Sequence, residues 1–509
     1  MRLSRRDVVD AVFVFALFAF VVVASLLRVE FGDTLQYKDG WWYLSRAWQH
    51  THGVIDNLSF YTLAYPLLVG AINWLVYDLP VSGMIANAII LLFMAFGIYL
   101  IGRLFFSRAV ALSSVFIFML NGKLLYHVRM FNADLLFMAA VTWMVIVATL
   151  LVRTTRRVWA VVLAILVGVS PYIRFESYVY GALILLVAAI FYKRAHGFQA
   201  LARQALFIGF IVGLLWMTYA VWFLSGADDL GGITNTWRYI TAHKLASWVQ
   251  NLAQTFNALD WIVIFTSAYS YIAALKKKTR RDKASAIRAI AFLSIPIAVA
   301  GVYVAFATPQ PDARYAFHVL PYLAIAYSLA IHNLYQYKRL FSVVLIALVL
   351  YVLIAAGTVG TLPAPMAFQS DARAVAIKQL AGDIHFWKHE NGYRDATIRT
   401  MCTDLMIFAQ FDVRLPFTGL TFNSQRFAPP ERALPEMAAH GDLLLTCPKG
   451  EIISDLRDIS SYWVDFYEHL NATPVLSEND PLEEVGRIGE YKIYRVKPEA
   501  ASERQFTAK

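Results

Sequence analysis

The sequence predicts a mainly α-helical membrane protein with about eleven spans and a small soluble α/β domain at its C-terminal end. The first observation is composition: 59% of the 509 residues are hydrophobic and 16% are charged, with a mean hydropathy of +0.53. Soluble chains carry about 25% charged residues. The second observation is charge, because residues 1–364 carry a net +15 and residues 365–509 a net −5. We therefore predict a transmembrane domain over residues 1–364, an extracytoplasmic domain over residues 365–509, and no nucleic-acid partner.

Apolar stretches of about 20 residues, the length of a membrane-spanning helix, recur through the first domain. They cover residues 8–29, 81–102, 107–121, 133–152, 158–173, 177–192, 204–224, 258–275, 286–307, 315–334 and 340–361. Residues 107–121 and 158–173 are the shortest of them. Residues 8–29 form a long stretch without a small-residue cleavage pattern, so we expect a retained first span rather than a signal peptide.

Lys and Arg in the short loops orient the chain in a plasma (inner) membrane. With the N-terminus in the cytoplasm, 20 of the Lys and Arg in residues 1–364 lie on the cytoplasmic side and nine on the other. An odd number of spans then places the C-terminal domain in the periplasm or outside the cell. Eleven of the 14 acidic residues in residues 1–364 fall at or beyond the outer ends of spans. Because ionisable groups at membrane depth usually face a cavity or a partner, we expect a polar site that opens to the outside.

Two outer loops are too long to be simple connections. Residues 30–80 mix aromatic and polar side chains, which favours amphipathic helices lying along the outer leaflet. Residues 60–77 could instead form a span, but this would reverse every later segment. The second loop, residues 225–257, combines cations with aromatic side chains, including Arg238 and His243. This mixture fits an anionic amphiphile, and it fits an interfacial helix without a ligand equally well.

The first outer loop contains the pattern D-x-x-x-Y-x-x-x-A, formed by Asp39, Tyr43 and Ala47. Here the sequence resembles the GT-C glycosyltransferase superfamily, in particular the branch of protein O-mannosyltransferases and the lipid A aminoarabinose transferase. Further similar motifs follow in the family's order over about residues 1–340. They are Tyr65-Pro66-Leu67-Leu68, Asn132-Ala133-Asp134-Leu135-Leu136, Arg174 with Glu176, and Arg314-Tyr315 with Pro321. One departure is Thr62-Leu63, which stands where the family has a pair of prolines.

The resemblance implies a GT-C helical bundle that transfers a hexose or pentose, with inversion, from a polyprenyl-phosphate donor. The acceptor would be a glycan, lipid or protein on the outer side of the membrane. It places the catalytic general base at Asp39, and Asp33 is the second choice in the same loop. Asp39 could also serve as the N-cap of a following helix. Further site candidates are Tyr43, Asp134, Glu176, Tyr315 and His243.

A lipid-phosphate leaving group needs cations that stabilise its charge, and arginine fits phosphate through its planar fork of donors. The candidates on the outer side are Arg314, Arg174, Arg238, Lys123 and Arg129. Arg314 could instead extend to the membrane surface without binding a ligand. Arg174 could pair with Glu176 or with a neighbouring acid.

Outer histidines show no compact spacing of the kind that metal ligands have, so we expect no required metal or other cofactor. These histidines are His50, His52, His127 and His243. A transporter or flippase for lipid-linked sugars is an alternative function, but it predicts internal repeats and charges in broken helices, and the sequence has neither. A non-catalytic assembly protein with the same fold is a further alternative.

The C-terminal domain shows helical spacing over residues 371–390 and short buried strands over residues 397–402 and 442–447. Residues 483–490 and 491–497 predict a final hairpin around Gly489. The only two cysteines, Cys402 and Cys447, each end a predicted strand. In an oxidising compartment they could form a disulfide, or they could be two buried free thiols.

Overall fold

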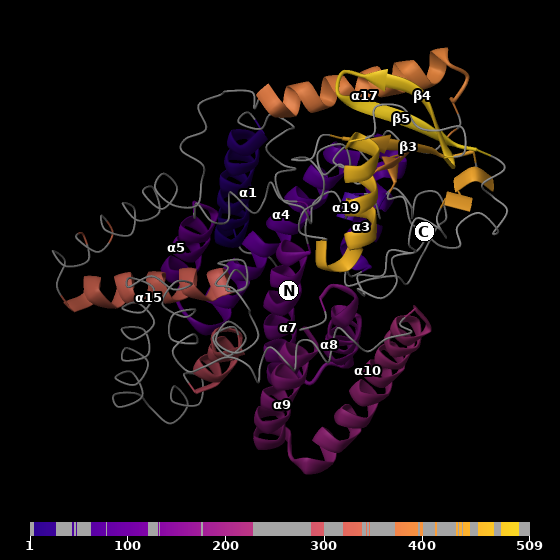
Figure 1. Ribbon diagram of the computed structural model, residues 1–509. Helices are drawn as coiled ribbons and strands as arrows, with labels where there is room; N and C mark the ends of the chain where they lie inside the picture. Colours follow the sequence, from indigo (N-terminus) through magenta and orange to yellow (C-terminus); the bar gives the residue numbers. More distant parts are fainter. Residues whose placement is uncertain are drawn as a thin grey trace, which may run out of the picture.

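A computed structural model describes both predicted regions of the chain. The described residues are 5–26, 43–44, 47, 63–77, 79–120, 131, 133–174, 177–226, 287–299, 319–337, 343, 346, 372–394, 396, 398–400, 413–414, 434–435, 437–439, 441–447, 457–472 and 480–497. Apolar helices form a bundle, and the strands gather with α17 at one side of it (Figure 1).

The described helices of the bundle overlap predicted apolar stretches in all but one case. They are α1 (Arg5–Leu26), α3 (Ala64–Val76), α4 (Leu79–Phe105), α5 (Arg108–Met119), α7 (Asp134–Thr154), α8 (Arg157–Val169), the 3₁₀ turn η2 (Ser170–Tyr172), α9 (Ser177–His196), α10 (Phe198–Gly226) and α15 (Leu320–Tyr337). A further apolar helix covers Ile287–Val299. Among the described residues, four helices are long and apolar enough to cross a membrane, namely Val81–Phe105, Asp134–Thr154, Ser177–His196 and Phe198–Val221. The predicted span at residues 258–275 lies outside the described residues, and only positions 343 and 346 of the span at residues 340–361 are described.

Among the described bundle helices, α3 is the one that falls in a predicted outer loop. Its 13 residues extend about 20 Å at 1.5 Å per residue, which is short of the roughly 30 Å hydrocarbon core. Tyr77 ends α3 in the left-handed conformation, with a φ of 56°, and α4 begins two residues later. Helices α5 and α8, which lie in predicted spans, have 12 and 13 residues, so the length of α3 does not decide whether this loop crosses the membrane.

Helix α7 lies at the centre of the bundle and packs against α4, α8 and α9. Most of its side chains are buried, whereas α10 exposes most of its apolar surface. Two contacts show that α4 and α7 run parallel. Arg153 of α7 donates to the carbonyl of Leu104 near the end of α4 at 2.6 Å, and Phe131, just before α7, lies against Gly83 near the start of α4. The described bundle therefore has two distinct ends, one at the starts of α4 and α7 and one at their last turns.

The C-terminal region forms a five-stranded mixed sheet with two helices. Its elements are α17 (Ala372–Glu390), β1 (Ile398–Thr400), β2 (Val413–Arg414), β3 (Leu443–Thr446), α19 (Arg457–Ala472), β4 (Leu482–Ile488) and β5 (Tyr491–Val496). The strand order is β2-β1-β3-β5-β4, with β1 parallel to β2 and β3 and with β5 antiparallel to β3 and β4. The predicted helix, both predicted strands and the hairpin at Gly489, whose φ is +57°, are confirmed. Strand β2 and helix α19 were not predicted.

Side-chain contacts join the two helices of this region to the sheet. The ring of Trp387 on α17 lies so close to Gly486 of β4 that a Cβ there would sit 2.3 Å from it. Tyr467 of α19 donates to the carbonyl of Leu445 in β3 at 2.9 Å. Burial raises the pKa of Tyr494 in β5 to about 12, so this phenol stays neutral inside the sheet. Cys447, which follows β3, is disulfide-bonded, and the only other cysteine, Cys402, lies outside the described residues.

Candidate functional site

Two of the predicted site residues, Asp134 and Arg174, meet at the end of the bundle where α7 starts. Asp134 is the first residue of α7, where the positive end of the helix dipole favours a carboxylate. Arg174 follows η2, in the turn between α8 and α9. A guanidinium nitrogen of Arg174 forms an ion pair with the Asp134 carboxylate, and the two side chains are 23% and 10% exposed. The sequence allowed Arg174 to pair with a neighbouring acid, and Asp134 is a partner in the structure.

The surroundings of Arg174 fix the direction of its side chain. Its backbone N–H donates to the carbonyl of Ser170 at 3.1 Å, and its own carbonyl accepts from the hydroxyl of Ser177 at 2.5 Å. The guanidinium carbon lies 5.8 Å from the centre of the Phe137 ring, within reach of a cation–π interaction. Phe137 in turn meets Tyr180 of α9 edge to face at 5.3 Å. The pair is therefore held by the first turn of α7, the turn after η2 and the first turn of α9.

The described part of the D-x-x-x-Y-x-x-x-A motif packs at the same end of the bundle. Tyr43, Leu44 and Ala47 are buried, with exposed fractions of 9%, 2% and 0%. The ring of Tyr43 meets that of Tyr65 in α3 edge to face at 5.5 Å. The hydroxyl of Tyr65 donates at 2.9 Å to the side-chain oxygen of Asn87 in α4. The tyrosine of the motif is thus joined to α3 directly and to α4 through Tyr65.

A glycine of α4 connects this motif to the start of α7. A Cβ at Gly83 would lie 2.6 Å from the ring of Phe131 and 3.4 Å from a methyl group of Leu44. Phe131 stands three positions before Asp134 in the chain. Only glycine lets the two side chains approach the α4 backbone this closely. The motif and the Asp134–Arg174 pair therefore lie at one end of the bundle, linked by Gly83 and Phe131.

The remaining predicted site residues lie outside the described residues, so their roles stay predictions. They are Asp33, Asp39, Lys123, Arg129, Glu176, Arg238, His243, Arg314 and Tyr315. Within the part of the chain that the structure describes, no group of three or more His, Cys, Asp or Glu side chains could hold a metal ion.

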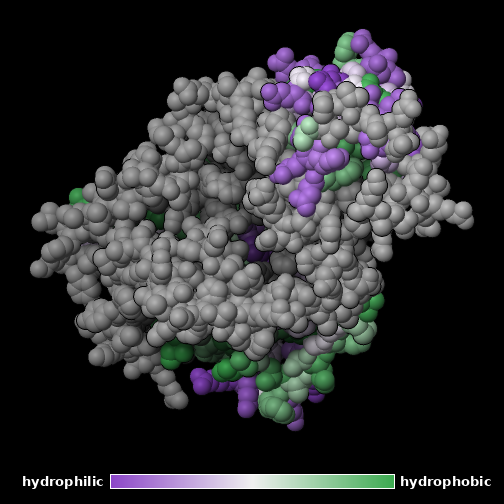
Figure 2. Space-filling model, viewed as in Figure 1, coloured by the Kyte–Doolittle hydropathy of each residue, from purple (hydrophilic) through white to green (hydrophobic). Residues whose placement is uncertain are grey.

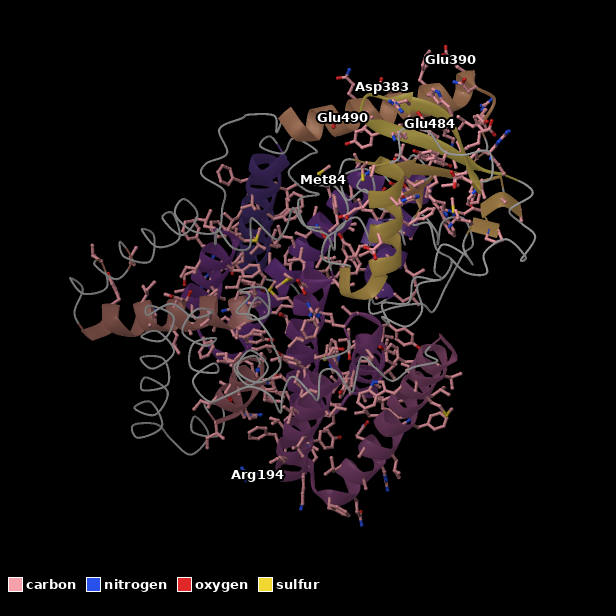
Figure 3. All side chains as sticks on the ribbon, viewed as in Figure 1. Met84, Arg194, Asp383, Glu390, Glu484 and Glu490 are labelled. Carbon is pink, nitrogen blue, oxygen red and sulfur yellow. The ribbon has the colours of Figure 1, made fainter. Side chains whose placement is uncertain are left out.

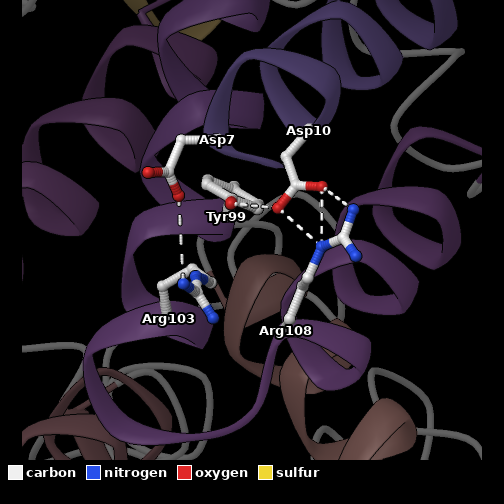
Figure 4. A network of polar contacts seen from close by, with 5 residues as sticks. All are labelled: Asp7, Asp10, Tyr99, Arg103 and Arg108. Carbon is white, nitrogen blue, oxygen red and sulfur yellow. Dashed lines mark hydrogen bonds and ion pairs between the residues drawn. The ribbon is translucent and has the colours of Figure 1, made fainter. Parts of the chain in front are cut away.

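A second polar network occupies the opposite end of the bundle, and the sequence did not predict it. Asp10 of α1 is 1% exposed and accepts hydrogen bonds from Nε and Nη2 of Arg108, at 2.8 and 2.5 Å, and from the hydroxyl of Tyr99 at 2.6 Å (Figure 4). Asp7 lies 4.0 Å from Arg103, and both of these side chains are more exposed. One signal for this network was present in the sequence. Asp10 begins an apolar run in which the next charged residue is Arg28, so a partner for its carboxylate was to be expected. The network joins the first turns of α1 to the corner between α4 and α5.

Comparison with known proteins gives structural neighbours only. No protein-family model and no curated protein sequence match the chain. ArnT from Cupriavidus metallidurans bound to undecaprenyl phosphate has a TM-score of 0.58 and 13% identity, covering 96% of this chain and 98% of that one. Its apo state has a TM-score of 0.54 and 14% identity, with 95% and 98% covered.

An archaeal oligosaccharyltransferase has the same fold. AglB from Archaeoglobus fulgidus, in complex with an inhibitory peptide and a dolichol-phosphate, has a TM-score of 0.52 and 11% identity, covering 90% of this chain and 72% of that one. AglB and ArnT, a lipid A aminoarabinose transferase, both belong to the GT-C superfamily. The chain therefore has the GT-C fold that its sequence motifs predict.

Proposed function

We propose that the chain is a membrane glycosyltransferase that moves a sugar from a polyprenyl-phosphate donor to an acceptor on the outer side of the membrane. The observation that carries the proposal is the match in fold over nearly the whole length of both chains to ArnT bound to undecaprenyl phosphate. AglB, solved with a dolichol-phosphate, adds a second neighbour that binds a polyprenyl phosphate. Since one fold can host many functions, the proposal also needs local support.

Local support comes from the residues around the motif of the first outer loop. Tyr43 and Ala47 are four positions apart and both buried, as expected for residues on one face of a helix. Asp39 stands one further helical turn before Tyr43, so a helix that continues backward would carry it on the same face. That face packs toward α3 and the start of α4, near the Asp134–Arg174 pair. We propose that the acceptor and the sugar meet above this end of the bundle.

The proposed reaction is a single displacement at the anomeric carbon. The acceptor hydroxyl gives its proton to the Asp39 carboxylate while its oxygen bonds to the anomeric carbon. The bond from that carbon to the phosphate oxygen breaks, and the polyprenyl phosphate leaves with the electron pair. One displacement inverts the configuration at the anomeric carbon.

Cations on the outer side would stabilise the charge that develops on the leaving phosphate. Arg314, Arg238, Lys123 and Arg129 are proposed for this role from the sequence. Arg174 is proposed as well, because its guanidinium lies beside Asp134 at this end of the bundle and its side chain is 23% exposed. Asp134 would then orient the arginine in the empty site and share it with the donor when the donor binds.

The test measures sugar transfer from radiolabelled polyprenyl-phosphate donors in membranes that contain the full chain. A panel of donors carrying mannose, glucose, galactose or 4-amino-4-deoxyarabinose covers hexoses and pentoses. We compare the native chain with Asp39→Asn, and use Asp56→Asn as a matched control in the same outer loop. Removing a general base slows transfer by about 10²–10⁴-fold, so Asp39→Asn should lose nearly all activity while Asp56→Asn keeps it.

Two outcomes would overturn parts of this proposal. Full activity in Asp39→Asn would move the base elsewhere, and Asp33→Asn is then the next variant. Absence of transfer from every donor, in membranes where the chain binds polyprenyl phosphate, would contradict a transferase and favour a lipid-linked sugar transporter or a non-catalytic assembly protein.

A further inference from the structure

Five basic side chains are exposed at the end of the bundle where α7 and α9 finish. Arg156 and Arg157 lie in the turn from α7 to α8, and Lys193 and Arg194 lie in the last turn of α9. Arg203 lies in the second turn of α10. In Figure 3, Arg194 points away from the molecule at the end opposite Glu390, Glu484 and Glu490. We name these five residues the basic corner.

The two turns of the basic corner are neighbours in space. A ring nitrogen of His196, at the end of α9, lies 2.9 Å from the carbonyl oxygen of Val152 in the last turn of α7. Helix α8 also packs along α10, with Val167 and Gly168 near its end against Trp216 and Leu215. Because both helices start at the end of the bundle where α7 and α9 finish, the start of α8 lies on the same side as the second turn of α10. The five cations therefore belong to one surface rather than to two separate turns.

Acidic residues are scarce in the segment of the sequence that carries these five cations. Between Asp134 and Asp228 the chain contains a single acid, Glu176, which follows η2 at the other end of α8. Within the described ranges, none of the five cations forms an ion pair. The corner between α4 and α5 differs, because its two arginines face Asp7 and Asp10.

An apolar band of exposed side chains borders the basic corner. Phe198, Leu206 and Phe210 of α10 are 67%, 76% and 73% exposed, and Val158 of α8 is 55% exposed. Figure 2 shows hydrophilic residues directly below such an apolar band at this end of the molecule. Side chains of this kind face lipid tails in a membrane, so the cations beside them lie at the level of the phosphate groups.

We propose that the basic corner binds anionic phospholipid, such as phosphatidylglycerol, in the leaflet that it faces. Charge complementarity favours this partner, because among the described residues none of the five cations has an acidic partner, although Lys193 also lies 5.7 Å from the centre of the Phe198 ring. Each cation near an anionic surface strengthens binding by about fivefold. The α4–α5 corner should contribute little, since Asp7 and Asp10 already pair with its arginines.

The test measures lipid binding to the purified full chain in detergent by native mass spectrometry, with phosphatidylglycerol and phosphatidylcholine as the two probes. The variant R156Q/R157Q/R194Q removes three of the five charges. The matched control R394Q/R487Q/R495Q makes the same chemical change at exposed arginines of the C-terminal region. We expect the first variant to bind phosphatidylglycerol at least about tenfold more weakly, with phosphatidylcholine binding unchanged and the control equal to the native chain.

Three results would contradict the proposal. They are native affinity for phosphatidylglycerol in R156Q/R157Q/R194Q, an equal loss in R394Q/R487Q/R495Q, and displacement of the lipid by soluble glycerol phosphate at the same concentration. The last result would assign the surface to a free phosphate compound rather than to a membrane lipid. A thermal unfolding curve for each variant confirms that it is folded, because these side chains are exposed and pack against little.

Discussion

Two pairs of aspartate and arginine join helices at opposite ends of the bundle, and their carboxylates differ in how completely they are covered. Asp10 is 1% exposed and accepts hydrogen bonds from both Arg108 and Tyr99. Asp134 and Arg174 keep 10% and 23% of their side-chain surfaces exposed and rest against the face of Phe137. The Asp10 carboxylate is covered by its partners, whereas the Asp134 carboxylate keeps a small exposed surface at the end of the bundle where Tyr43 and Ala47 pack.

This difference separates a structural pair from a candidate site. The Asp10 carboxylate is covered and already accepts several hydrogen bonds, so we assign its network to holding α1 against α4 and α5. Both guanidiniums are partly exposed, by 44% in Arg108 and by 23% in Arg174, so the second pair is distinguished by its less covered carboxylate and by its place beside Tyr43 and Ala47. The same two residue types therefore serve different purposes because of what lies around them.

The largest effect is expected from Arg108→Ala, which takes the cation and its hydrogen bonds away from an Asp10 carboxylate that is 1% exposed. Removing one partner of such a pair costs about 3–5 kcal/mol, and we expect the melting temperature of the full chain in detergent to fall by about 5 °C. Arg103→Ala is the matched control. Its partner Asp7 is 4.0 Å away and 34% exposed, so a change of about 1 °C is expected. Equal losses in the two variants would show that burial of Asp10 does not decide the outcome.

Arg174→Ala should lower the melting temperature less, by about 4 °C, because Asp134 keeps some contact with solvent.

The double variants D134N/R174Q and D10N/R108Q compare what the two ion pairs contribute to sugar transfer. Both replace an ion pair by neutral amides of similar shape, so both should recover much of the stability. If the first pair belongs to the site, D134N/R174Q stays below a tenth of native sugar transfer, while D10N/R108Q transfers at the native rate. Sugar transfer at the native rate by D134N/R174Q would show that both ion pairs only stabilise the fold.

Gly102→Ala tests the packing beside the Asp10 network. An added Cβ would lie 2.5 Å from the Cα of Ala111, so α4 and α5 must separate at their corner. Such overpacking costs about 1–3 kcal/mol, and we expect a fall in melting temperature of about 3 °C. Gly209→Ala in α10 is the control, because nothing lies within 4 Å of its Cβ position. Alanine favours a helix over glycine, so this control should match or exceed the native melting temperature.

Much of the fold could be predicted because the positions of its helices and turns follow from local features of the sequence. The apolar stretch at residues 133–152 matches α7, Asp134–Thr154, within two residues, since a bilayer demands a long run without charge. Gly489 marks the hairpin of β4 and β5 because its φ is positive. Helix α19 was missed although Ile459, Trp463, Phe466 and Leu470 have helical spacing, a signal that the many polar residues between them obscured.

The candidate site could be predicted in its residue types but not in its pairings. Sequence spacing placed Asp134 and Arg174 on the same side of the membrane, yet their contact depends on how α7, α8 and α9 pack. The Asp10 network depends on three helices in the same way, with partners 89 and 98 positions away in the chain. A sequence without aligned relatives carries no record of such distant contacts, so only the fold could supply them.

Tyr99→Phe should give the smallest measurable effect and is the most direct probe of how Asp10 is satisfied. It removes one hydrogen bond, of 2.6 Å, and leaves both bonds from Arg108 in place. A hydrogen bond to a charged group contributes about 1.5–3 kcal/mol, of which the retained arginine should recover part, so we expect a fall of about 2 °C in melting temperature. When Tyr99→Phe is added to D10N/R108Q, the melting temperature should fall by less, because the side chain at position 10 that accepts this hydrogen bond is then a neutral amide. An undiminished cost there would mean that Tyr99 stabilises the corner by packing, and that Arg108 alone keeps the Asp10 carboxylate in the closed end of the bundle.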